Sequence, residues 1–218
     1  MADMIFDTEI YRGVDYYSSD QTTSTNLTCL KSKGFDDFVC RYYSSSVVDK
    51  NLTKEEAETI SNAGFYIVPV FQNRQNQIAD FDYSQGFERG RSAAGKADIV
   101  GQPYNSAIYF AVDFDVQTTE EIDAVKDFFR GVNATFNEYA NYNNGNKWLI
   151  GVYGSYTTVK ELDGYYGVTK TWQTSSWSEN NYSARNLYQY EHNLSNFCNI
   201  DPNIDKNASD GSHGGFRL

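Results

Sequence analysis

The sequence predicts an α/β barrel of the TIM type, with eight mostly parallel strands arranged as five βα units followed by three strands with little helix. Two observations lead to this fold. Short β-rich runs alternate with helical segments over residues 12–162, which is typical of parallel strands joined by right-handed crossovers. Three further strand-like runs then follow with only short polar loops between them. A doubly wound open sheet is the alternative, but the first strand lacks its usual glycine-rich phosphate-binding turn.

The first three units alternate in an orderly way. Strands are expected over residues 12–17, 38–44 and 66–72. A helix that ends near Gly34 follows the first strand, and Thr53-x-x-Glu56 is a capping box that starts the second helix. A third helix is expected over residues 83–99, although its three glycines weaken the helical pattern.

The fourth strand is the run "AIYFAVDFDV", residues 107–116. Thr118-x-x-Glu121 is a second capping box, and an apolar stripe follows it at helical spacing. The fifth unit comprises a strand over 147–155 and a helix over 156–162. The last three strand-like runs fall within residues 170–177, 186–192 and 196–205. We therefore expect one barrel domain over residues 1–210 and a flexible Gly/Ser-rich tail over 211–218.

The composition excludes several classes of partner. A formal net charge of −11 repels phosphate backbones, so nucleic acid is not an expected partner. The longest apolar runs are far shorter than the ~20 residues of a membrane span, so no membrane insertion is expected. The first residues show no basic segment followed by an apolar core, so no signal peptide is visible. The composition leaves the oligomeric state open.

The cysteines do not form the pattern of a disulfide framework. Cys29, Cys40 and Cys198 are few and widely spaced, and their odd number favours reduced thiols. A single bridge, either Cys29–Cys40 or Cys40–Cys198, stays open as an alternative.

Candidate site residues lie where the predicted strands end. Active sites of parallel barrels are found at the carboxyl ends of the strands. The polar residues there are Asp15, Arg41, Gln72, Asp113, Asp115, Tyr153, Gln189, Glu191 and Asp201. Side chains alternate along a strand, so Asp113 and Asp115 would line the barrel mouth together if Ala111 faces the lumen. Phe110 and Val112 would then pack outward.

Converging carboxylates suit glycoside hydrolysis, which needs a protonated acid and a second carboxylate that stabilises or attacks the sugar cation. Crowded like charges raise the pKa of at least one carboxyl and so supply the proton donor. The expected catalytic residues are Asp113, Asp115, Asp15 and Asp201, and the expected substrate-binding residues are Arg41, Gln72, Tyr153, Trp172, Gln189 and Glu191. Aromatic residues that could stack on sugars are Tyr17, Tyr43, Trp172, Trp177 and Tyr190.

Structural roles compete with these assignments. Asp115 could be a turn or cap residue, Arg41 could simply neutralise the acidic mouth, and Trp172 could belong to the core. Metals are not expected, because no His/Cys spacing matches zinc. Residues 201–212 begin like a calcium loop but lack its glycine and its final glutamate. No cofactor is expected.

Five segments, "RGVDYY", "DDFVCRYYS", "KNLTKEEAETISNAGFYIVPVFQ", "AIYFAVDFD" and "IGVYGSY", together resemble the glycoside-hydrolase-like domains long catalogued as a domain of unknown function. That family is similar to the family 25 glycoside hydrolases, the Chalaropsis-type lysozymes. The resemblance runs from about residue 12 to residue 205. The closing "YQYE…NIDPN" is similar to the final pattern of the lysozymes.

The resemblance implies a function. Asp15, Asp113 and Asp201 match lysozyme site positions, whereas Asp115 stands where the lysozymes have their general acid, a glutamate. It implies cleavage of peptidoglycan or a related N-acetylated glycan, with Asp115 as acid and Asp113 orienting the N-acetyl group or stabilising its charge. Such a protein would be secreted or act on cell walls. The alternatives are a catalytically weak or inactive carbohydrate-binding module and a protein-binding effector domain.

Overall fold

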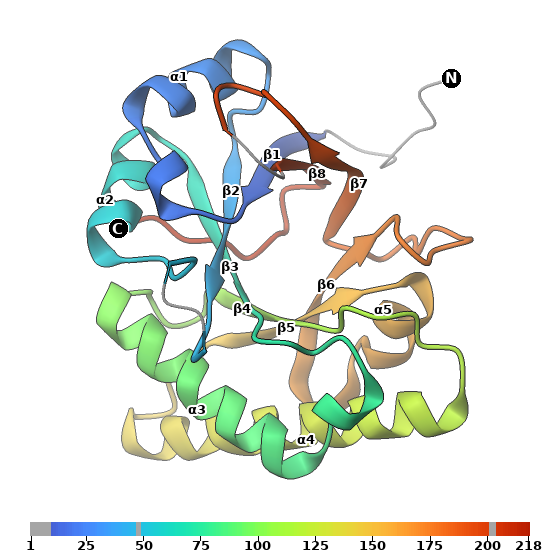
Figure 1. Cartoon of the computed structure of the whole chain (residues 1–218). Coiled ribbons are helices and arrows are strands. Elements are labelled where there is room, and N and C mark those ends of the chain that lie inside the picture. Colours follow the sequence, from blue (N-terminus) through green and yellow to red (C-terminus); the bar gives the residue numbers. More distant parts are fainter. Residues whose placement is uncertain (1–9, 47–48, 201–203) are drawn as a thin grey trace.

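The computed structural model describes residues 10–46, 49–200 and 204–218. Eight strands close into a barrel in chain order (Figure 1). They are β1 (Tyr11–Tyr16), β2 (Phe38–Tyr43), β3 (Tyr66–Phe71), β4 (Ala107–Ala111), β5 (Leu149–Gly154), β6 (Val168–Thr174), β7 (Leu187–Leu194) and β8 (Ile204–Ser209). Strands β1 to β7 pair in parallel, whereas β8 is antiparallel to both β7 and β1. The predicted barrel of mostly parallel strands is confirmed.

Each of the first five strands is followed by a helix, as the sequence predicts. The helices are α1 (Ser24–Ser32), α2 (Lys54–Asn62), α3 (Tyr83–Val100), α4 (Thr119–Tyr142) and α5 (Tyr156–Leu162), and short 3-10 turns lie at Ser19–Gln21, Ile78–Asp80 and Tyr165–Gly167. Among the described residues, no helix lies between β6 and β7 or between β7 and β8. In the part of the chain that the structure describes, no helix has the length and apolarity to cross a membrane.

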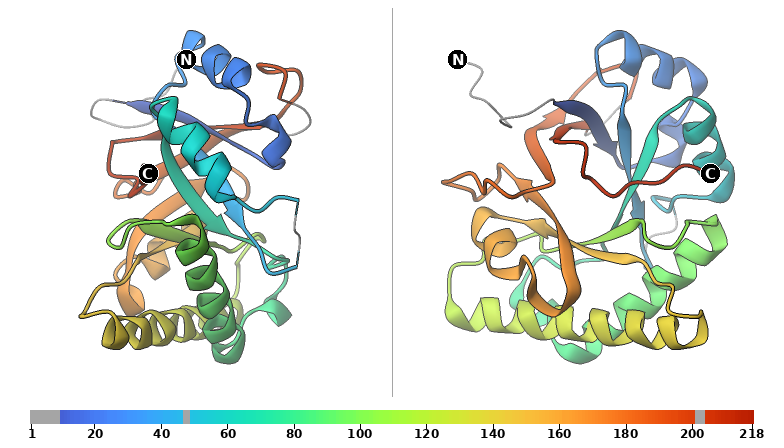
Figure 2. Two further views of the ribbon diagram at one scale, coloured as in Figure 1. Left: turned by 90° about the vertical axis from the view of Figure 1, so that its left-hand side faces the viewer. Right: turned by 180° about the vertical axis from the view of Figure 1, so that it is seen from behind.

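Helices α3 and α4 lie side by side along one side of the barrel (Figures 1 and 2). Their contact explains two of the three glycines that weakened the helix prediction over 83–99, Gly86 and Gly90, whereas a Cβ on Gly95 would meet open space. A Cβ on Gly86 would stand 1.9 Å from the backbone oxygen of Phe128, and a Cβ on Gly131 would stand 2.2 Å from that of Tyr83. These glycines therefore allow a close backbone approach, and tertiary packing compensates for their poor helix propensity.

The barrel separates two apolar layers, as strand alternation predicts. One layer fills the space between the strands and the helices and contains Phe110 and Val112. The other fills the lumen and contains Ala111, Tyr109 and Trp172. The predicted orientation of β4, with Ala111 inward and Phe110 outward, is confirmed.

The two predicted capping boxes differ. Thr118 and Glu121 cap each other reciprocally at the start of α4, so this box is confirmed. At the start of α2, Thr53 accepts a hydrogen bond from the Glu56 backbone N–H, but the Glu56 carboxylate turns into the protein interior and pairs with Arg41. The buried Arg41 guanidinium requires a charged partner, so the Glu56 carboxylate pairs with it and does not return to the Thr53 backbone N–H to complete the capping box.

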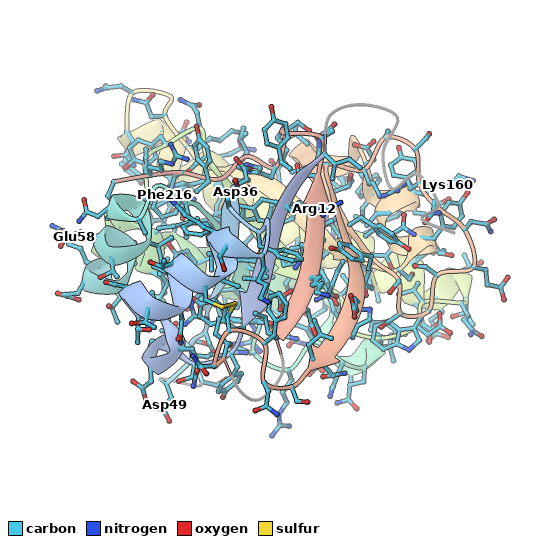
Figure 3. All side chains as sticks on the ribbon, turned by 90° about the horizontal axis from the view of Figure 1, so that it is seen from above. Arg12, Asp36, Asp49, Glu58, Lys160 and Phe216 are labelled. Carbon is cyan, nitrogen blue, oxygen red and sulfur yellow. A yellow bond between two sulfur atoms is a disulfide. The ribbon has the colours of Figure 1, made fainter. Side chains whose placement is uncertain are left out.

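A disulfide joins Cys29 and Cys198, whereas Cys40 is a free, buried thiol (Figure 3). The preference for reduced thiols was wrong, and so were both alternative pairings. The bridge links α1 to the segment after β7, where the rings of Phe35 and Phe197 also make an edge contact at 5.5 Å. A separation of 169 residues gives no local signal, so only the fold shows that the two cysteines meet.

Residues 211–218, predicted as a flexible tail, pack across the amino-terminal end of the barrel. The Ala107 N–H donates to the Gly214 oxygen at 2.7 Å, and Phe216 forms a bridge with Ile67. His213 is buried and contacts the Asp37 carboxylate at 3.1 Å. The chain ends beside α2 (Figure 1). The packing of residues 211–218 could not be predicted from their own composition, because the residues that anchor them lie on β3 and β4, far away in the sequence.

Candidate active site

A cavity of about 150 Å³ opens at the carboxyl ends of the parallel strands. It is lined by Asp15, Tyr42, Val70, Gln72, Ala111, Asp113, Tyr153, Trp172, Gln189 and Asp205. Three carboxylates, one each from β1, the segment after β4, and β8, therefore meet at one mouth. Six of the site residues proposed from the sequence line this cavity. They are Asp15, Gln72, Asp113, Tyr153, Trp172 and Gln189.

Asp15 is the most enclosed of the three carboxylates, with only 2% of its surface exposed. Its Oδ1 accepts from the Tyr42 hydroxyl at 3.2 Å, and its Oδ2 accepts from the amides of Gln189 at 2.9 Å and Asn207 at 2.8 Å. Burial raises the pKa of Asp15 to about 7, and the nearby charge of Asp205 adds to the rise. Asp15 is therefore a buried carboxyl poised to titrate near neutral pH.

Asp205 lies directly across from Asp15 in the β1–β8 ladder. Because β8 is antiparallel to its neighbours, its first residues, and not its last, reach the mouth. The Gln189 amide donates to Oδ2 of both carboxylates, at 2.9 Å each, while its oxygen accepts from the Tyr153 hydroxyl at 2.7 Å. One amide thus holds the two carboxylates in place, and the tyrosine fixes the orientation of that amide.

His192, on β7, stands behind Asp205. Its Nδ1 lies 3.9 Å from Asp205 Oδ2, and its Nε2 lies 2.7 Å from the Ser175 hydroxyl oxygen. The hydrogen bond and the charge of Asp205 raise the pKa of His192. A protonated His192 would partly balance the negative charge at this side of the mouth.

Asp113 lies just beyond the end of β4 and is half-buried. Its backbone N–H donates to the Gln75 oxygen at 2.8 Å, and its Oδ2 accepts from the Gln72 amide at 2.8 Å. Burial raises the pKa of Asp113, with a smaller contribution from the charge of Asp205, while Lys50 and the Gln72 bond oppose the rise. Asp113 combines access to the cavity with a raised pKa, which a proton donor requires.

Lys50 supplies a positive charge close to the mouth. Only 4% of its surface is exposed, and its Nζ lies 3.4 Å from the Gln72 oxygen and 4.9 Å from the centre of the Tyr42 ring. Burial lowers the pKa of Lys50 to about 8, although the charge of Asp113 favours the protonated form. Lys50 could not be predicted from the strand pattern, because it comes from a loop and not from a strand end.

Asp115 does not line the cavity. It lines a neighbouring groove, and its carboxylate accepts a hydrogen bond from the Gln117 side chain. Strand β4 ends at Ala111, so the strict alternation that placed Asp113 and Asp115 on one face does not extend to residue 115. The structure thus separates the two aspartates into adjacent hollows.

Two other predicted positions were wrong. Arg41 is fully buried on the outer face of β2, where its Nε lies 2.6 Å from Glu56 and its guanidinium donates to the backbone oxygens of Tyr16 and Tyr17. Alternation along β2 turns the neighbouring Tyr42 to the cavity instead. Glu191 is also absent from the cavity lining and pairs with Lys206 at 2.9 Å.

Trp172 lines the cavity but is only 1% exposed, and its ring nitrogen donates to Asn207 at 2.9 Å. It therefore forms the floor of the cavity and offers no open face to a sugar. Tyr43 is likewise buried and bonds to Gln102. Asp201 lies outside the described residues, as do residues 202 and 203 of the calcium-like segment. Within the described residues, no group of three or more His, Cys, Asp or Glu side chains is arranged to hold a metal ion.

The model of the family "Rv2525c-like, glycoside hydrolase-like domain" matches residues 28–208. The chain belongs to this family. Two uncharacterized proteins of Bacillus subtilis (strain 168) are similar in sequence. YbfG is 34% identical over 99 residues, which cover 45% of this chain and 14% of YbfG. FadG is 30% identical over 145 residues, covering 65% of this chain and 24% of FadG. The matched part of this chain thus covers less than a quarter of the length of YbfG or of FadG.

Solved structures share the fold. The Mycobacterium tuberculosis Tat-secreted protein Rv2525c, in complex with L-tartrate, has a TM-score of 0.76 at 18% identity, covering 94% of this chain and 98% of the other. An uncharacterized B. stearothermophilus protein has a TM-score of 0.67 at 19% identity, with 94% and 100% coverage. The modular autolysin LytC from Streptococcus pneumoniae, with a synthetic peptidoglycan ligand, has a TM-score of 0.59 at 11% identity, covering 92% of this chain and 46% of LytC.

Proposed function

We propose that this glycoside hydrolase-like domain cleaves glycosidic bonds in peptidoglycan or a related N-acetylated glycan. The observation that carries the proposal is the convergence of Asp15, Asp113 and Asp205 in one enclosed cavity at the barrel mouth. Glycoside hydrolysis needs one protonated and one ionised carboxyl beside the same bond. Burial raises the pKa of Asp15 and of Asp113, so two of the three carboxyls can hold the proton that this reaction requires.

In this proposal Asp113 donates a proton to the leaving oxygen. It is the carboxyl with both access to the cavity and a raised pKa. The resemblance to lysozymes assigns this role to Asp115, but Asp115 lines the neighbouring groove. Asp205 is the partner that stabilises positive charge on the sugar or on its N-acetyl group. Asp15 has hydrogen bonds on both oxygens, so it positions Gln189, and besides burial its charge helps to raise the pKa of Tyr42 and Tyr153.

The size of the cavity limits what it can hold. Its volume of about 150 Å³ is well below the ~300–1,000 Å³ of typical ligand pockets. It suits one substituent, such as an N-acetyl group, or one edge of a sugar ring. The remainder of a glycan would then extend over the rim formed by the mouth loops.

Two further observations support action outside the cytoplasm. Disulfides such as Cys29–Cys198 persist mainly in oxidising compartments. Rv2525c is described as Tat-secreted, and LytC as a modular autolysin in complex with a synthetic peptidoglycan ligand. We therefore propose that this chain is secreted and acts on cell walls.

The experiment is digestion of purified cell walls, with released muropeptides identified by mass spectrometry. Asp113→Asn should lower the release rate by about 10²–10⁴-fold, since that is the usual contribution of a general acid. Asp115→Asn is the matched control and should stay within about tenfold of wild type, because its carboxyl lies outside the cavity. An inactive Asp115→Asn beside an active Asp113→Asn would overturn this assignment of the acid.

A non-catalytic glycan-binding module is the second candidate. It is favoured by the full set of hydrogen bonds on Asp15 and by the absence of Asp115 from the cavity. Sugar binding by wild type, Asp113→Asn and Asp115→Asn without cleavage by any of them would establish this second function.

A further inference from the structure

A second hollow lies beside the cavity and has a different character. This groove of about 530 Å³ is lined by Asp115, Val116, Gln117, Tyr156, Thr157, Trp177, Glu179 and Asn180. These residues come from the loops after β4 and β6 and from the start of α5, all at the carboxyl end of the barrel. We propose that the groove is a subsite for a second, uncharged ring of the same glycan, with Trp177 as its stacking platform.

Trp177 differs from the other two tryptophans of the chain. Its side chain is 45% exposed, whereas Trp148 and Trp172 are each 1% exposed. Its backbone φ is +55°, a left-handed conformation that is rare for a bulky residue. Such strain concentrates at binding sites, where the surrounding structure holds it in place.

The loop around Trp177 is fixed by hydrogen bonds on both sides. The Ser176 N–H donates to the Thr174 hydroxyl at 3.1 Å. The Ser178 hydroxyl donates to the Thr174 oxygen at 2.6 Å and accepts from the Tyr156 N–H at 2.8 Å. An exposed aromatic ring on a loop held in this way is preorganised, so ligand binding would lose little conformational entropy there.

The chemistry of the groove matches a sugar ring. The apolar face of a sugar stacks on an indole, while carboxylates and amides such as Asp115, Glu179 and Asn180 accept and donate hydrogen bonds to hydroxyl and N-acetyl groups. Among the described residues that line the groove there are two carboxylates and neither Lys nor Arg, so an anionic polymer is disfavoured.

The position of the groove relates it to the cavity. Asp113 lines the cavity and Asp115 lines the groove, and two residues span at most about 7 Å. Neighbouring rings of one chain can therefore occupy both hollows. The inference rests on the proposed function, because it assumes that a glycan fills the cavity, and it adds that the ligand is a chain and not a single sugar.

The test is binding of N-acetylglucosamine oligomers of two to six rings to the Asp113→Asn protein, measured by calorimetry and tryptophan fluorescence. The longer oligomers should shift the emission, since only Trp177 among the three tryptophans faces solvent. Adding Trp177→Ala should lower the affinity for these oligomers by about tenfold, or 1.4 kcal/mol, and leave the affinity for N-acetylglucosamine itself, which can fill the cavity alone, unchanged. Trp177→Phe should retain most of the affinity, and Tyr142→Ala, at an exposed tyrosine on α4, is the control.

Oligomer affinities that Trp177→Ala leaves unchanged would overturn the subsite alone. Equal affinity for an oligogalacturonate of the same length would overturn its preference for an uncharged ring. Failure of the parent protein to bind any oligomer would overturn the subsite and the proposed function together. Length-dependent binding through Trp177 without cleavage of cell walls would support the subsite and contradict only the hydrolysis.

Discussion

Asp15→Asn should raise the free energy of unfolding above that of wild type at high pH, and the pKa of Asp15 in the folded protein determines by how much. The folded pKa of about 7 lies above the ordinary value of 3.8, so the folded state binds the proton more tightly than the unfolded chain does. The stability that this proton confers is complete below pH 3.8 and is lost as the pH rises through 7. At higher pH the protein therefore carries a buried negative charge at a cost in stability.

The magnitude follows from the shift. Roughly 3 pH units at 1.36 kcal/mol each amount to about 4 kcal/mol, reached when Asp15 is fully ionised. Asparagine has nearly the same shape and no charge. Its carbonyl can accept from Gln189 and Asn207, and its amide can donate to the Tyr42 oxygen. The free energy of unfolding of Asp15→Asn relative to wild type should thus rise by about 3 kcal/mol between pH 4.5 and 8.5.

Urea unfolding at the two pH values measures this difference, since the free energy of unfolding falls linearly with denaturant. Asp123→Asn, at an exposed carboxyl on α4, is the matched control and should follow wild type at both pH values. A difference between Asp15→Asn and wild type that is the same at pH 4.5 and 8.5 would refute the reasoning, because the buried proton would then contribute nothing.

The remaining predictions concern residues outside the cavity. Arg41→Met should lower the free energy of unfolding by about 3–5 kcal/mol, because it leaves Glu56 buried without its partner, and should leave glycan affinity of the folded protein unchanged. If calorimetry showed that folded Arg41→Met no longer binds sugar, Arg41 would instead have the direct role in substrate binding that the sequence suggested. Replacing both Cys29 and Cys198 by serine should lower the free energy of unfolding in urea by about 2–5 kcal/mol. If a reductant left the wild-type unfolding midpoint unchanged, the bridge would have no stabilising role.

Local patterns predicted most of the fold. The alternation of strands and helices, and the capping box at Thr118, depend on residues close in sequence, so they could be read before the structure was known. The direction of β8 depends instead on how the last strand closes the barrel. An expected parallel strand would end at the mouth, whereas the antiparallel strand begins there and brings Asp205 and Asn207 to Asp15. Those two residues were therefore missed.

Some residues of the candidate site could also be predicted from local patterns, whereas others depend on contacts between distant segments. Asp15, Gln72 and Gln189 were predicted because they occupy strand ends on the lumen side. Arg41 was wrongly predicted to line the mouth because only its position near a strand end was used, and not the face of β2 on which its side chain lies. Its partner Glu56 lies 15 residues away on α2, so a local pattern does not show the pair. Lys50 and the Cys29–Cys198 bridge depend on contacts between distant segments, and a pattern along one chain does not show them.

The most direct test of the central claim is a crystal structure of Asp113→Asn with an N-acetylglucosamine tetramer. An N-acetyl group or ring edge should fill the cavity within hydrogen-bond distance of residue 113 and Asp205, and the scissile glycosidic oxygen of the tetramer should face residue 113. A tetramer bound elsewhere on the barrel, with the cavity between Asp15, Asp205 and residue 113 left to solvent, would contradict it.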